Sequence, residues 1–139
     1  MLRKLLACLA GILVMGVTVG LVEGMGHALF PPPEGLDLSN PEHLAGLMEQ
    51  IPWQAKLMVL LAWAGGALAG SLVAGQIARA APLGPCLVVA VAMLLGTAVS
   101  LWMIPHPWWM AAAGIALPLP IAWACARWIS SRTTVEAAG

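Results

Sequence analysis

The chain has 139 residues, of which 61% are hydrophobic and 9% are charged, and its six basic and six acidic residues give a net charge of zero. Ordinary soluble domains are about 25% charged, so a water-soluble fold of this length would have too few charges to cover its surface. Together with a mean hydropathy of +0.92, this composition predicts an integral membrane protein whose main partner is the lipid bilayer. No basic patch is visible, which argues against a nucleic-acid partner.

Four apolar runs are long enough to cross a bilayer, which takes about 20 residues for a helix. They cover residues 5–30, 55–78, 84–104 and 108–129. Backbone groups in lipid must hydrogen-bond within their own segment, and these runs do not alternate polar and apolar residues as barrel strands do, so each is predicted to be a helix. The sequence therefore predicts an all-α fold, in which residues 1–139 form a single four-helix transmembrane bundle.

The first run follows Arg3 and Lys4, as the core of a signal peptide would. Its apolar stretch is longer than such a core, so we expect a helix that is not cleaved. Near its end it carries Glu23 and His27, which are four residues apart and therefore share a helix face. An ionisable side chain near the hydrocarbon boundary is costly unless it is paired or hydrated, which makes this pair the first candidate for function.

Glu23 and His27 are of the types that bind a proton, a divalent metal or a lipid headgroup. The alternative is a local pair that fixes the end of the helix and the loop after it. His43 in that loop, and His106 between two prolines, are predicted to lie at the same face of the membrane and to extend the candidate site. No cofactor is expected apart from such a metal on Glu23 and His27.

The loop at residues 31–54 is the largest segment outside the predicted spans. Three prolines at 31–33 end the first helix, because proline lacks an amide donor and clashes with the preceding turn. The run at 39–42 combines a capping side chain, an early proline and an acid, as helix starts do. Apolar residues then recur at helical spacing, which predicts a short amphipathic helix on the membrane or over the bundle: Leu44, Leu47, Met48 and Ile51.

Small residues spaced four apart form ladders on three of the predicted helices. In lipid, such residues let helix backbones approach closely. The ladders are Gly16, Gly20 and Gly24; Ala62, Gly66, Gly70 and Ala74; and Ala92, Gly96 and Ser100. We favour packing within the chain as their role, and the alternative is a seam between copies of the protein.

Pro118 and Pro120 fall in the middle of the fourth run. They remove two amide donors and so free the carbonyls of Gly114 and Ala116. The pattern predicts a kink, and the alternative is a hinge or a site lined by carbonyl groups. Trp63 and Trp123 also fall inside spans, where we expect them to pack or to face lipid.

Basic residues set the predicted orientation. All of them except Lys56 flank the runs on one side, which the positive-inside rule assigns to the cytoplasm: Arg3, Lys4, Arg79, Arg127 and Arg132. We therefore expect both termini in the cytoplasm and the loop at 31–54 on the outer side.

The run from Glu23 to His27, followed by Phe30, the three prolines and Gly35, resembles a group of small bacterial four-span membrane proteins that have no assigned function. The stretch at 61–70, rich in alanine and glycine, shares the resemblance. It implies a location in the bacterial inner membrane and brings no activity. It also implies that Glu23, His27 and the outer loop are features common to the group.

Three classes of function follow from these patterns. We favour an accessory or scaffold component of a membrane assembly, because the chain is small, rich in packing ladders and poor in reactive groups; its partners would be further copies or other membrane proteins. The second class is an oligomeric channel or transporter for a small solute or metal ion, using the outer Glu/His cluster. A membrane-embedded enzyme comes last, since no nucleophile–base set is visible.

Overall fold

The computed structural model of the chain describes residues 1–31 and 51–138, with side chains as far as residue 133. Its helices are α1 (Leu2–Leu29), α3 (Trp53–Ile77), α4 (Leu83–Met103), α5 (Trp108–Ala116) and α6 (Pro118–Ala138). No strand occurs in these residues, so the described chain is all-helical, as predicted. Four helical stretches are long and apolar enough to cross a membrane, and the fourth combines α5 with α6 as far as Thr133.

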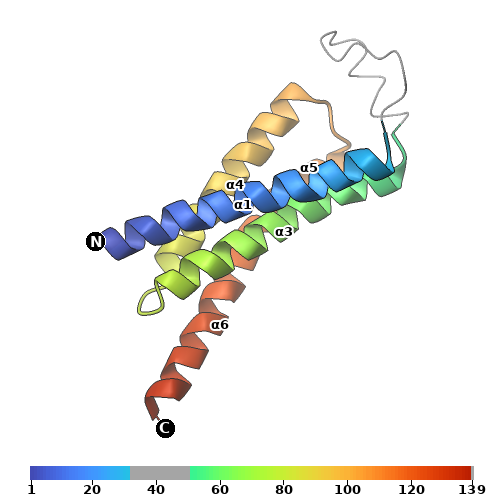
Figure 1. Ribbon diagram of the computed structural model, residues 1–139. Helices are drawn as coiled ribbons and strands as arrows, with labels where there is room; N and C mark the ends of the chain where they lie inside the picture. Colours follow the sequence, from blue (N-terminus) through green and yellow to red (C-terminus); the bar gives the residue numbers. More distant parts are fainter. Residues whose placement is uncertain (32–50, 139) are drawn as a thin grey trace.

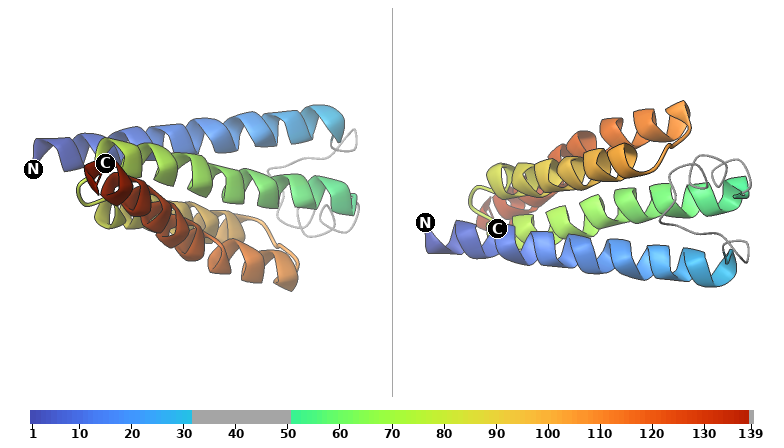
Figure 2. Two further views of the ribbon diagram at one scale, coloured as in Figure 1. Left: turned by 90° about the horizontal axis from the view of Figure 1, so that it is seen from below. Right: turned by 90° about the horizontal axis from the view of Figure 1, so that it is seen from above.

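The other helices pack around α3. α1 lies antiparallel beside it along most of its length (Figure 1), and α4 and α6 contact it as well. α4 also contacts α6 and α1. Figure 2 shows that both chain ends and the α3–α4 turn lie at one end of the molecule, whereas the α4–α5 turn lies at the other end. The four helical stretches therefore run up and down along a common length.

Glycines allow α1 and α3 to touch through their backbones. A Cβ atom added at Gly70 would lie 2.6 Å from the carbonyl oxygen of Gly11, and one added at Gly11 would lie 2.8 Å from that of Gly70. Further along, a Cβ at Gly66 would come within 3.1 Å of the Met15 carbonyl oxygen. Close approach through glycine gains dispersion contacts, which are the main source of helix association where lipid removes the hydrophobic drive.

Two small clusters of buried side chains form the interior: Trp63, Ala67, Met93 and Met110, and then Cys86, Ala90, Ala122 and Ala126. The Trp63 side chain is 4% exposed, and its ring lies against Gly114, where an added Cβ would be 2.7 Å from ring carbon Cε3. Trp63 therefore packs inside the protein, one of the two roles expected for it. Trp123 is 54% exposed on α6.

A break at Leu117 divides the fourth stretch into α5 and α6. Pro118 has no amide to donate to the Gly114 carbonyl, so the helical hydrogen-bond pattern lapses there. Pro120 likewise cannot donate to the Ala116 carbonyl, and after it the Ile121 amide donates to the Leu117 carbonyl oxygen at 3.2 Å. Pro118 is buried and Pro120 is exposed. The backbone thus has a break where the two prolines predict one, and a hinge motion there stays a prediction.

Candidate functional site

Glu23 and His27 lie in the last two turns of α1. The two residues are joined through the backbone: the Nδ1 atom of His27 lies 2.8 Å from the Glu23 carbonyl oxygen. A carbonyl oxygen only accepts hydrogen bonds, so Nδ1 donates here, and in the neutral imidazole the lone pair lies on Nε2. The Glu23 side chain is half-buried and that of His27 is exposed. This geometry anchors the imidazole at the helix end and leaves Nε2 as its one free ligand atom.

His106 lies in the turn between α4 and α5. Its Nδ1 atom is 2.7 Å from the Ile104 carbonyl oxygen, and its ring centroid lies 5.8 Å from that of Trp63. The half-buried imidazole therefore ties this turn to the interior beside α3. His43 and the amphipathic segment at Leu44, Leu47 and Met48 lie outside the described residues. Within the described ranges, no three His, Cys, Asp or Glu side chains come together as a metal site.

The glycine ladder of α1 lies on the side of that helix away from α3. A Cβ added at Gly16, Gly20 or Gly24 would meet no atom of another described residue within 4 Å. The flanking side chains of Leu13, Val17 and Leu21 are 54–67% exposed. These six residues form the glycine face of α1. Residues three, four and seven apart share a helix face, so His27, seven residues after Gly20, continues this face.

The ladder of α3 is placed differently, since Gly66 and Gly70 are buried against α1. Gly96 on α4 is exposed, and a Cβ added there would have no atom of another described residue within 4 Å. Sequence reasoning missed Gly11, whose carbonyl oxygen would lie 2.6 Å from a Cβ added at Gly70 on α3. Gly11 stands outside the four-residue ladder, so spacing alone could not identify it.

Two polar side chains that the sequence analysis did not single out are fully buried. Ser71 Oγ and Thr97 Oγ1 have no hydrogen-bond partner among the described residues. Next to Ser71, the Cys86 thiol donates to the Ser71 carbonyl oxygen at 3.2 Å. A hydroxyl among apolar residues in an apolar run gives no sequence signal of burial, because the same residue type on the other side of the helix would be exposed.

Five of the six basic residues belong to the parts of the helices near the end of the molecule that holds both chain ends and the α3–α4 turn (Figure 2). They are Arg3, Lys4, Arg79, Arg127 and Arg132, and we call them the basic end. Arg3 Nε donates to the Ile77 carbonyl oxygen at 2.6 Å and so joins the start of α1 to the end of α3. The Arg127 guanidinium lies 5.0 Å from the ring centroid of Trp123. Cation–π contact and packing hold such guanidinium groups against the helix surface.

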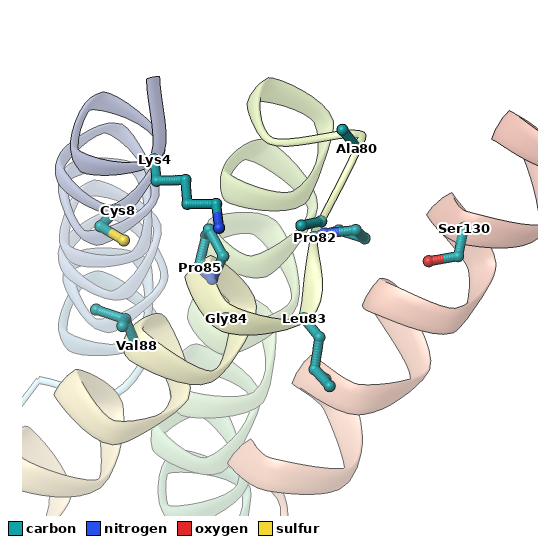
Figure 3. A pocket seen from close by; sticks show the side chains of 10 residues that line it. Lys4, Cys8, Ala80, Pro82, Leu83, Gly84, Pro85, Val88 and Ser130 are labelled. Atoms are coloured by element: carbon teal, nitrogen blue, oxygen red, sulfur yellow. The ribbon is translucent and has the colours of Figure 1, made fainter. Parts of the chain in front are cut away.

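Two hollows open at the basic end. The larger, about 530 Å³, lies between the start of α1, the α3–α4 turn and α6 (Figure 3). The Lys4 side chain reaches across it toward Pro85, and the Ser130 hydroxyl points in from α6. Its remaining lining is mostly apolar and includes Cys8 and Val88. The smaller hollow, about 90 Å³, is lined by Gln76, Arg79, Trp128, Ile129, Arg132 and Thr133.

Comparisons of the chain with protein-family models, with curated proteins and with solved structures find no match. The resemblance to small bacterial four-span proteins therefore stays a prediction.

Proposed function

We propose that the protein is a multi-pass protein of the bacterial inner membrane, with both termini in the cytoplasm, that serves as an accessory or scaffold component of a membrane assembly. One observation carries this proposal: the glycine face of α1 is built for close helix packing and is left uncovered by the described chain. Only 11% of the most apolar 18-residue stretch of α1 is buried, compared with 39% for α3. A neighbouring transmembrane helix would cover the glycine face.

Glycine-to-leucine substitutions on α1, compared with one on α4, test the docking role of α1. Gly16→Leu with Gly20→Leu fills open space, so the chain should fold normally while the added side chains hold a neighbouring helix away. Gly96→Leu is the matched control, because it adds the same side chain to an exposed helical glycine of α4. We expect native mass spectrometry of gently extracted protein to show loss of the assembly for the α1 variant alone.

In detergent, neither variant should unfold at a lower temperature than the wild type, because leucine is a better helix former than glycine. An assembly that survives the double change on α1, or that is lost equally with Gly96→Leu, would contradict docking through the glycine face. The mass of the intact assembly also identifies its composition. Further copies of this chain and other membrane proteins are the two partners that the proposal allows.

The second candidate is an oligomeric channel or transporter, and the position of Glu23 favours it. Glu23 is half-buried at the edge of the glycine face, and no ion pair joins its carboxylate to another described side chain. A helix docked on the glycine face would lie beside Glu23 and His27, and so enclose a carboxylate and a free imidazole nitrogen. Replacing both with glutamine should then abolish flux of a small solute or divalent metal through reconstituted protein while the assembly persists. Unchanged flux would contradict the channel or transporter role and leave the scaffold as the remaining proposal.

A further inference from the structure

Arg79 and Arg132 converge on one small hollow although they belong to different parts of the chain. Arg79 follows the end of α3, and Arg132 lies on the last described turns of α6. Both line the 90 Å³ hollow together with Gln76 and Thr133. Two guanidinium groups that share one site repel each other, which costs free energy unless an anion lies between them.

Each guanidinium is held in place by a neighbour. A terminal nitrogen of Arg79 donates to the Gln76 side-chain oxygen at 3.1 Å. The Arg132 guanidinium lies 4.2 Å from the ring centroid of Trp128, as in a cation–π pair. Positioning by these neighbours reduces the side-chain entropy that a bound anion would have to remove. The small hollow is therefore lined by two positioned guanidinium groups, and each guanidinium can recognise phosphate through paired hydrogen bonds.

As far as side chains are described, in residues 1–31 and 51–133, Glu23 near the far end of α1 is the one acidic residue, so no carboxylate among them lies at this end. We propose that the hollow between Arg79 and Arg132 binds a phosphate group, and that an anionic phospholipid supplies it. The proposal rests on the membrane insertion proposed above and is independent of the scaffold role.

Two features favour a lipid over free phosphate. Trp128 is 44% exposed beside the hollow, and tryptophan at the end of a membrane span marks the level of the headgroups. The two hollows are lined by consecutive residues of the chain: Arg79 and Ile129 line the small one, and Ala80 and Ser130, labelled in Figure 3, line the larger, mostly apolar one. A headgroup phosphate fits the charged hollow, and the apolar part of the molecule fits the surface beside it. Basic sites between membrane helices hold anionic headgroups in this way.

The test measures lipid binding to the full chain in detergent, by native mass spectrometry with phosphatidylglycerol or phosphatidylcholine added. The wild type should prefer phosphatidylglycerol, and Arg79→Gln with Arg132→Gln should weaken its binding by about tenfold or more, since each tenfold step is about 1.4 kcal/mol. Lys56→Gln with Arg127→Gln is the matched control: it removes two charges, but neither residue lines the small hollow. The control should bind phosphatidylglycerol as the wild type does.

If the control pair loses as much phosphatidylglycerol binding as the Arg79/Arg132 variant, the effect is one of net charge and the site is overturned. A wild type that does not prefer phosphatidylglycerol would also overturn it. If the wild type and the Arg79/Arg132 variant bind phosphatidylglycerol alike, the proposal is overturned. Raised melting temperature of delipidated protein in inorganic phosphate, with no lipid preference, would assign the site to free phosphate and overturn the lipid source. Arg79→Lys with Arg132→Lys keeps both charges and the fold, and should lose part of the affinity because the paired hydrogen bonds are gone.

Discussion

Replacing Gly70 with alanine should push α1 away from α3. The new Cβ would lie 2.6 Å from the Gly11 carbonyl oxygen and 2.8 Å from the Met15 Cβ, closer than side-chain carbons come to either. Both obstacles are close to the α1 backbone, so no side-chain rotation relieves them and the helix itself must shift. Overpacking of this kind costs about 1–3 kcal/mol, and the loss of dispersion along the rest of the α1–α3 interface adds to it.

Gly20→Ala is the matched substitution, because the same methyl group meets open space on the other side of α1. Alanine is the better helix former by about 1 kcal/mol, so this change should be neutral or stabilising. The assay is unfolding of purified protein in mild detergent, by heat or by titration with a denaturing detergent, followed by circular dichroism. Equal midpoints for the two variants would refute the close backbone contact between α1 and α3.

Three further predictions concern the interior and the orientation. Trp63→Ala should destabilise the fold by about 3–5 kcal/mol because it empties a buried cluster, whereas Trp123→Ala, at an exposed position, should shift the unfolding midpoint little; similar shifts would contradict the assigned core. Thr97→Val removes a buried hydroxyl that has no partner among the described residues, so it should be neutral or stabilising by about 1 kcal/mol, and a lower midpoint would show that the hydroxyl is bonded. A reporter fused after residue 139 should be active in the cytoplasm, and activity outside would refute the orientation taken from the basic residues.

The scaffold and lipid proposals assign different partners to two parts of the molecule. The glycine face of α1 would contact a protein neighbour, and the basic end would contact the anionic leaflet. In the described chain, α6 packs on α3 and α4. A lipid held between α3 and α6 would also brace the end of α6. Phosphatidylglycerol should therefore raise the unfolding midpoint of the isolated chain. This can be measured without the assembly.

Hydropathy determined the all-helical class and the four long apolar stretches, because a chain this apolar satisfies its backbone groups most simply as helices. The break before Pro118 was also readable from the sequence, since a missing amide acts locally whatever surrounds it. The gathering of five basic residues at one end followed from counting spans, because each span reverses the chain direction.

Only the tertiary structure decided which small residues meet. Gly70 and Gly20 have the same local spacing, yet one touches the backbone of α1 and the other faces outward. Every face of these helices is apolar, so the pattern that orients a helix in a soluble protein is missing here. The candidate site shows the same limit: the sequence indicated Glu23 and His27, which are local to one helix, but the convergence of Arg79 and Arg132 depends on how α3 and α6 pack. Contacts between helices are set by shape complementarity, which one-dimensional spacing does not encode.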